Sequence, residues 1–161
     1  MPVIPNALDK ALVWGDRRFT LLNRLNPGRQ TLGITLVTET TLTIASILNS
    51  GTATRFPDIR FIWSHGGGTA PYITGRLGAG DPAVMREIQQ FYYDTAQAFN
   101  EYTLPTFTAV VPNSHILFGT DYPFRQAGAV ASALADYRFA AADLRAIERD
   151  NALELFPRLT Q

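Results

Sequence analysis

The sequence contains no cysteine and only two histidines among its 161 residues. The absence of cysteine excludes disulfides, thiolate nucleophiles and zinc sites built on cysteine. Fourteen basic residues balance fourteen acidic ones, so neither sign of charge is in excess. A chain without a basic surplus lacks the electrostatic footprint of a protein that binds nucleic acid or an anionic membrane.

Long apolar runs and secretion signals are also missing from the sequence. No apolar stretch approaches the roughly 20 residues that a membrane span needs. Residues 1–10 lack the basic segment followed by an apolar segment that marks a signal peptide. We therefore expect a cytoplasmic protein. With 46% hydrophobic and 17% charged residues, the chain is long enough for one globular domain with its own core.

The middle of the chain carries the clearest secondary-structure pattern. The continuous apolar run at 59–63 is typical of a buried parallel strand, and 91–94 and 115–119 are predicted as the second and third strands. Their starts are roughly 24 to 32 residues apart, which is the spacing of strand–helix–strand units with right-handed crossovers. Elsewhere the pattern favours helices over 7–25, 40–51, 126–137 and 141–156, and a short strand over 32–37.

Polar side chains follow each of the three predicted strands. The first strand ends in Ser64 and His65, the second in Asp94, and the third in Thr120 and Asp121. Because the carboxyl ends of parallel strands open on the same side of a sheet, these groups should lie near one another. An imidazole can bind a metal or take a proton, and a carboxylate can bind a divalent metal. The sequence therefore predicts a chemical site at this edge.

Three glycines follow His65 directly. Gly66, Gly67 and Gly68 allow positive φ, and we expect them to leave room for a ligand beside the imidazole. Thr69 is expected to cap a helix whose start would suit a substrate carboxylate. No Lys-Ser or Lys-Thr pair follows the glycines, so they do not form a phosphate-binding loop.

Each candidate also has a structural interpretation. A histidine after an apolar strand, such as His65, is often only a hydrogen-bonded structural group. The position of Asp94 favours a helix cap over a metal ligand, and Asp121 suits the turn that precedes Pro123. The second histidine, His115, begins its strand and should lie at the opposite end of the sheet, so we interpret it as structural.

Four segments in the same order resemble the amidohydrolase-related (amidohydrolase 2) family of metal-dependent decarboxylases, which includes aminocarboxymuconate semialdehyde and 6-methylsalicylate decarboxylases. The segments are 55–77, 91–100, 116–124 and 151–159. The resemblance implies an α/β fold, a partial TIM-type (β/α) barrel built from its C-terminal strand–helix units with parallel strands. It further implies a single truncated domain over 1–161, with a divergent N-terminal segment at 1–37 and the family-like C-terminal barrel part at 38–160.

The resemblance also implies a function, the nonoxidative decarboxylation of an aromatic or unsaturated carboxylic acid with a divalent metal, zinc or manganese. His65 matches the family's catalytic histidine beside the metal, and Asp121 matches its metal-binding aspartate, so both are predicted catalytic residues. We also predict substrate contacts at Gly66, Gly67 and Tyr122, and supporting roles behind the site for Asp94 and Arg76. A hydrolase of small molecules from the same superfamily is an alternative.

The sequence departs from this family in its length and in its histidines. A complete barrel of this kind needs about 250 residues. The family's His-x-His motif and its fifth-strand histidine have no counterpart here. His65 and Asp121 alone would make a poor catalytic metal site. A second hypothesis is therefore an inactive chain that needs a partner, with a homodimer or a complementing chain rebuilding the closed sheet.

Overall fold

The computed structural model describes residues 32–160. Its centre is a sheet of three short strands in the order β1-β2-β3. The strands are β1 (Ile62–Trp63), β2 (Tyr92–Asp94) and β3 (Ile116–Leu117). Both pairings are parallel, with Ile62 opposite Tyr92 and Tyr93 opposite Ile116. The three predicted strands are thereby confirmed in position and direction, although each is shorter than its predicted range.

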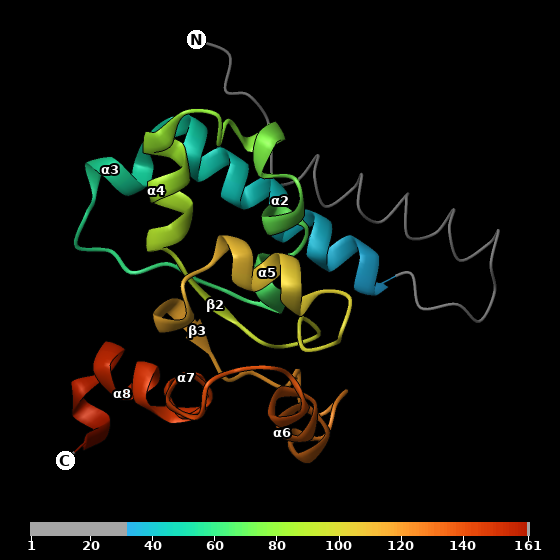
Figure 1. Ribbon diagram of the computed structural model, residues 1–161. Helices are drawn as coiled ribbons and strands as arrows, with labels where there is room; N and C mark the ends of the chain where they lie inside the picture. Colours follow the sequence, from blue (N-terminus) through green and yellow to red (C-terminus); the bar gives the residue numbers. More distant parts are fainter. Residues whose placement is uncertain (1–31, 161) are drawn as a thin grey trace, which may run out of the picture.

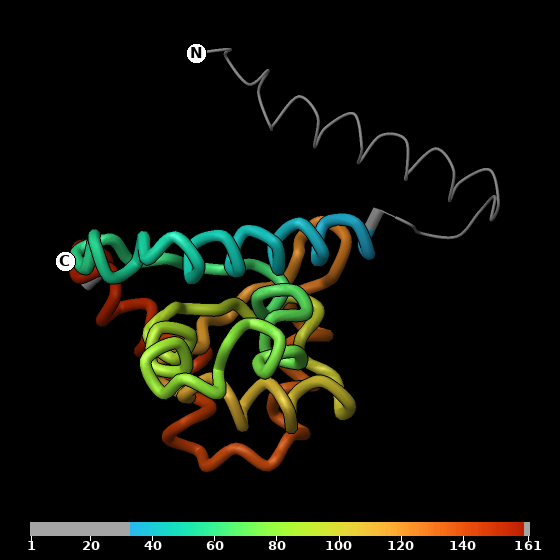
Figure 2. The backbone as a smooth tube through the Cα atoms, turned by 90° about the horizontal axis from the view of Figure 1, so that it is seen from above, coloured from blue at the N-terminus to red at the C-terminus, as the bar shows by residue number. Residues whose placement is uncertain are grey.

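Helices surround this sheet, and the longest of them, α2, lies along one side of the molecule (Figures 1 and 2). The α-helices are α2 (Leu32–Ser50), α3 (Thr52–Arg55), α4 (Pro82–Gln90), α5 (Leu104–Val110), α6 (Ala127–Asp136), α7 (Ala141–Arg145) and α8 (Asn151–Leu155). A π-helical turn, η5 (Ala146–Asp150), joins α7 to α8, and the 3-10 turns are η1 (His65–Gly67), η2 (Ala70–Tyr72), η3 (Thr74–Leu77), η4 (Asn113–His115) and η6 (Pro157–Thr160). The predicted helices near 126–137 and 141–156 are therefore present.

Helix α2 shows that the strand predicted at 32–37 is wrong. Its threonine hydroxyls donate to the carbonyl four residues earlier, at Thr38, Thr40, Thr41 and Thr43. These bonds satisfy the hydroxyls within the helix, so a threonine-rich segment can continue it. Ile44 is fully buried and anchors the helix in the core. The helix predicted at 40–51 is the C-terminal part of α2, whereas the one predicted at 7–25 lies outside the described residues.

One face of the sheet is buried beneath the helices. Tyr93 and Ile116 are both fully buried, and they belong to one core cluster with residues of α2, α4, α5 and α6. The Tyr93 hydroxyl donates to the Ile88 carbonyl at 2.8 Å, so its burial leaves no unpaired hydroxyl. Alternation along the strands places Ile62 on the opposite face, and 43% of its surface is exposed. In a closed barrel this second face is the interior.

A buried asparagine ties the C-terminal helices to the sheet. Asn151 is 5% exposed, and its Nδ2 donates to the carbonyls of Asn113 at 2.7 Å and Ile116 at 2.8 Å. Both acceptors lie at the start of β3, where the chain enters the sheet. The segment 151–159, which carries part of the family resemblance, therefore fixes the position of the third strand.

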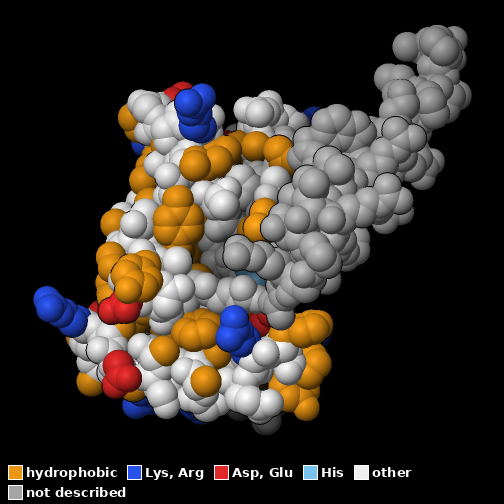
Figure 3. All heavy atoms as spheres, turned by 90° about the vertical axis from the view of Figure 1, so that its right-hand side faces the viewer, with side chains coloured by type: hydrophobic (Ala, Val, Ile, Leu, Met, Phe, Trp, Pro, Cys, Tyr) orange, Lys and Arg blue, Asp and Glu red, His pale blue; other side chains and the backbone are white. Residues whose placement is uncertain are grey.

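Large apolar side chains remain exposed on the described part of the chain. Tyr102, Tyr122 and Phe124 are each more than 70% exposed. Figure 3 shows such side chains around a hollowed surface on the side of the molecule that it presents. Within the described sheet, β1 and β3 are both outer strands with one neighbour each. Among residues 32–160, no helix combines the length and apolarity needed to cross a bilayer.

Candidate active site

The carboxyl ends of the strands bring together the two residues that the sequence marks most strongly. His65 follows β1 and Asp121 follows β3. The Nε2 atom of His65 lies 3.5 Å from Oδ1 of Asp121, and the two side chains are 17% and 18% exposed. The imidazole and the carboxylate are therefore neighbours at one edge of the sheet, and an imidazole can hold and transfer a proton. We call these two residues the site pair.

Asp94, at the end of the central strand, fixes the backbone of this site. Its Oδ1 accepts from the His65 N–H at 2.7 Å and from the Ala96 N–H at 3.0 Å. Burial raises the pKa of Asp94 above its ordinary value, and the N–H groups of His65 and Ala96 oppose that rise. No helix begins directly after Asp94, so it is not the helix cap that we considered. It accepts instead from the Ala96 N–H in the following turn and from the His65 N–H in the neighbouring loop.

Two substitutions of Asp94 should have different effects on the free energy of unfolding. Asp94→Ala leaves two part-buried N–H groups without their acceptor and is expected to cost about 1–3 kcal/mol. Asp94→Asn keeps a neutral acceptor and should be better tolerated. Denaturant titration of both variants and the parent protein at neutral pH measures the difference. Equal stability of the two variants would contradict the role of Asp94 as an acceptor.

The raised pKa of Asp94 also predicts a pH dependence of stability. Between the unfolded and folded pKa values, the folded state binds more protons than the unfolded state. The free energy of unfolding therefore falls as pH rises through that window and keeps the lower value above it. Asp94→Asn should remove this contribution, which is seen as the difference between the pH profiles of the two proteins.

The glycine-rich loop packs against the core more tightly than the sequence indicates. A Cβ on Gly66 would lie 2.7 Å from the Ala98 Cβ, and one on Gly67 would lie 2.7 Å from the Tyr93 ring. Both glycines are buried and have positive φ. The space that we expected for a ligand at these Cβ positions is thus filled by protein, which corrects that expectation. Substrate contacts through the backbone of Gly66 and Gly67 remain a prediction.

After the glycines the chain forms two short 3-10 turns, η2 and η3, in place of an α-helix. The Thr69 side chain does not cap η2, which corrects that expectation. Instead, the hydroxyls of Thr69 and Thr41 lie 2.9 Å apart, and the Thr69 N–H donates to the Thr41 hydroxyl oxygen at 2.8 Å. Thr69 therefore attaches the loop to α2, and so short a turn offers no helix start to a substrate carboxylate.

Two of the predicted site residues have no hydrogen bond or ion pair between their side chains and the site pair. Tyr122 follows Asp121 in the chain, but its side chain is 74% exposed. Arg76 is exposed on η3, and its side chain has no ion pair or hydrogen bond with the described residues. The roles assigned to Tyr122 and Arg76 remain predictions without a contact to support them.

Gln97 also belongs to the site, although it is not among the site residues predicted from the sequence. Its Nε2 donates to Oδ2 of Asp121 at 2.7 Å. The residue lies in the family-like segment 91–100, but no spacing in that segment marks its side chain as a neighbour of Asp121. Only the folded turn after β2 shows that it reaches the carboxylate.

His115 lies at the amino ends of the strands, as the sequence predicts. Its ring lies 4.6 Å from that of Tyr92, and its Nδ1 is 3.0 Å from the Ser114 hydroxyl oxygen. Burial lowers the pKa of His115, Arg60 lowers it further, and Glu154 opposes both. These contacts support the interpretation of His115 as a structural residue.

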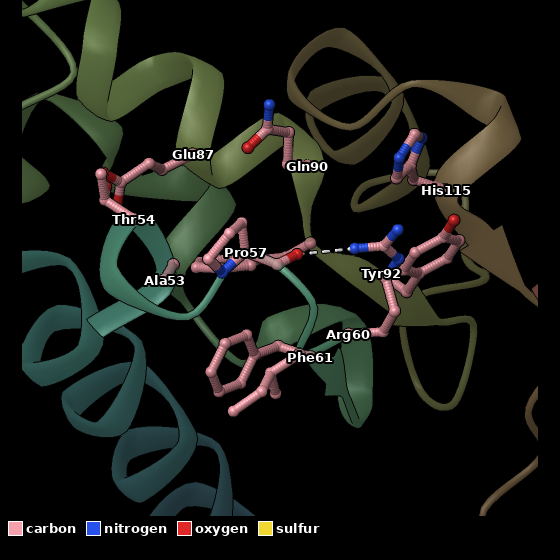
Figure 4. Close-up of a pocket in the computed structure, with 11 residues that line it drawn as sticks. Ala53, Thr54, Pro57, Arg60, Phe61, Glu87, Gln90, Tyr92 and His115 are labelled. Carbon is pink, nitrogen blue, oxygen red and sulfur yellow. Dashed lines mark hydrogen bonds between the residues drawn. The ribbon is translucent and has the colours of Figure 1, made fainter. Parts of the chain in front are cut away.

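A pocket of about 500 Å³ lies beside His115, between α3, α4 and the strand starts (Figure 4). Arg60, Tyr92 and Glu87 are among its lining residues. The Arg60 guanidinium donates to the Pro57 carbonyl at 2.8 Å rather than standing free. This pocket is at the opposite end of the strands from the site pair, so it is not the predicted site.

The described residues offer few ligands for a metal ion. Among residues 32–160, no group of three or more His, Cys, Asp or Glu side chains is arranged to hold one. Catalytic zinc sites use three protein ligands. The site pair offers two candidate ligands at most, so the described residues alone do not fit a complete catalytic metal site.

Comparison with known proteins identifies the fold family. The sequence pattern of the family described as Amidohydrolase matches residues 11–158. The chain belongs to the amidohydrolase family. This amidohydrolase is 32% identical over 135 residues to the 6-methylsalicylic acid decarboxylase of Penicillium expansum, a match that covers 75% of the chain and 42% of the relative. The chain therefore spans less than half the length of this curated relative, and the family resemblance is confirmed.

Solved structures agree with this assignment. A 2,6-dihydroxybenzoate decarboxylase from Rhizobium superposes with a TM-score of 0.68 at 25% identity, over 78% of this chain and 42% of that one. A dihydroxybenzoic acid decarboxylase from Polaromonas sp. JS666, with bound manganese and the inhibitor 2-nitroresorcinol, gives 0.73 at 23% identity, over 99% and 49%. The predicted fold class, a partial TIM-type barrel with parallel strands, is confirmed.

Proposed function

We propose that this amidohydrolase chain is the C-terminal part of a metal-dependent decarboxylase that acts on a small aromatic or unsaturated carboxylic acid. The observation that carries the proposal is the site pair, with His65 and Asp121 3.5 Å apart at the carboxyl ends of parallel strands. That edge is where barrels of this type carry their chemistry. Relatives named as decarboxylases of 6-methylsalicylic and dihydroxybenzoic acids support the substrate class.

The site pair can supply the proton that this reaction needs. Nonoxidative decarboxylation replaces a carboxylate by hydrogen and releases CO₂. In the proposed reaction, Nε2 of a protonated His65 donates to the carbon that bears the carboxylate. The bond to the carboxylate then breaks, and its electron pair stays with the ring as CO₂ leaves. Asp121 stabilises the imidazolium before the transfer, and water restores the proton on His65 afterwards.

The metal ion of the proposed enzyme requires ligands beyond the described residues. Asp121 is the proposed ligand on this chain, and His65 lies next to it. A second copy or a complementing chain is the proposed source of the missing ligands. The outer strands β1 and β3, each with one neighbour in the described sheet, provide edges for such an assembly.

A non-catalytic chain is the second candidate function. The small number of metal ligands among the described residues favours it. In this case, the family's strands and site pair are retained as structure, and the chain acts through a partner.

Metal uptake and CO₂ release distinguish the two candidates. The protein is supplied with manganese or zinc, dialysed, and analysed for metal content, with Asp121→Asn as the control. It is then assayed with 6-methylsalicylate and 2,6-dihydroxybenzoate over a range of protein concentrations. The decarboxylase predicts about one divalent ion per chain and CO₂ release, both lost in Asp121→Asn. No bound metal and no CO₂ at any concentration would support the non-catalytic chain.

A further inference from the structure

Three residues other than glycine have left-handed backbone conformations in the described part of the chain. They are His65 with φ 55°, Gln97 with φ 56° and Asp121 with φ 62°. Side chains disfavour this region, and residues held in it cluster at functional sites. Each of the three follows a different strand of the sheet. Two of them form the site pair, and Gln97 is the third residue that shares this backbone conformation at the carboxyl ends of the strands.

The side chain of Gln97 completes the environment of the Asp121 carboxylate. Its Nε2 donates to Oδ2 at 2.7 Å, while Oδ1 lies 3.5 Å from Nε2 of His65. An ionised carboxylate only accepts hydrogen bonds, so the nitrogen end of the amide must face it. Because the amide holds one oxygen, the carboxylate cannot rotate freely and keeps its other oxygen towards the imidazole.

The turn that carries Gln97 is held on both sides. The Thr95 hydroxyl donates to the Gly119 carbonyl at 2.9 Å and accepts from the Gly119 N–H at 3.0 Å. The Ala98 N–H donates to the Thr95 carbonyl, and Ala98 is buried. These bonds fix the backbone that carries Gln97. A side chain on a fixed backbone can hold the Asp121 carboxylate in one orientation.

We propose that Gln97 is a positioning residue, whose amide orients the Asp121 carboxylate so that one oxygen faces His65. The proposal rests on the proposed function of the site pair for its catalytic consequence. The geometry itself is independent of turnover. Without the amide donor, the carboxylate rotates, and the imidazole loses its fixed partner.

NMR of the histidine side chains tests this geometry even if the protein has no enzymatic activity. The chain has two histidines, so labelling with ¹⁵N-histidine gives two sets of ring signals, and His115 serves as an internal reference. Gln97→Leu removes the donor, and Gln97→Gly removes it while allowing the same φ without strain. Both variants should shift the ring signals of His65 and leave those of His115 in place. Gln90→Leu, at the opposite end of the strands, should leave His65 unchanged.

The same samples measure the consequence for cation binding and turnover. Loss of a group that orients a ligand typically weakens metal affinity or activity by roughly 10–100-fold. We expect that loss in the broadening of the His65 signals by added Mn²⁺ and, where the parent releases CO₂, in kcat with KM nearly constant. Unchanged His65 signals in both Gln97 variants would overturn the proposal. If Mn²⁺ leaves the parent unaffected while the Gln97 variants still shift His65, the proposed metal function fails and the positioning role stands.

Discussion

In the proposed decarboxylase, His65→Asn is expected to lower kcat by roughly 10²–10⁴-fold, the usual contribution of a positioned acid or base. Asparagine is suited to this position because it tolerates the positive φ that His65 adopts. The loop should therefore keep its conformation, and the loss should come from the missing proton donor. Asp94 should still accept from the backbone N–H of residue 65. The change in kcat is measured as CO₂ release, with the protein assembled in the form that shows activity.

The second histidine provides the matched control for this substitution. His115→Asn changes the same residue type at the opposite end of the strands, beside Tyr92. Its kcat should remain close to that of the parent, because His115 lies at the opposite end of the strands from the site pair. Comparable activity of His65→Asn and the parent protein would remove His65 from the proposed mechanism.

Gly68→Ala is expected to destabilise the fold by about 3 kcal/mol or more, a large share of the stability of a small domain. Gly68 has φ 67°, where a side chain is strained. A Cβ at this position would collide with the Val37 carbonyl oxygen and lie 2.7 Å from the Thr41 hydroxyl oxygen. Because Val37 and Thr41 belong to α2, either the loop or the helix would have to move. Denaturant titration measures the free energy of unfolding.

Gly128→Ala separates this collision from the general effect of replacing glycine. Gly128 lies in α6 and is exposed, and a Cβ there would have no neighbour within 4 Å. Alanine favours the helix, so this variant should be as stable as the parent or more stable by up to about 1 kcal/mol. If Gly68→Ala were as stable as Gly128→Ala, the tight contact between the loop and α2 would not exist in solution.

The sheet and the site pair could be predicted because they follow from period and topology. Buried parallel strands have mostly apolar sequences, and the carboxyl ends of parallel strands lie at the same edge of a sheet. This topology brings His65 and Asp121 to the same edge, although they are far apart in the sequence. Asp94 was also found by its place at a strand end, where it binds the His65 backbone.

The remaining features depend on contacts that no local pattern encodes. Residues 32–37 have the β-branched composition of a strand, but packing of Ile44 and threonine bonds to preceding carbonyls hold them in α2. The glycines after His65 suggested room for a ligand, whereas the space at Gly67 is taken by Tyr93. The contact of Gln97 with Asp121 could be found only from the folded turn after β2.

The order of the strands also determines which local opening would separate His65 from Asp121. His65 follows one outer strand and Asp121 follows the other, so β2 between them is the only strand through which the described sheet joins the two. Local opening of β2 would separate the imidazole from the carboxylate even if both outer strands kept their own helices. Tyr93, fully buried in the middle of β2, makes that opening costly. The population of competent site pairs should therefore follow the cooperative stability of the central strand, and not the mobility of the loops that carry the two residues.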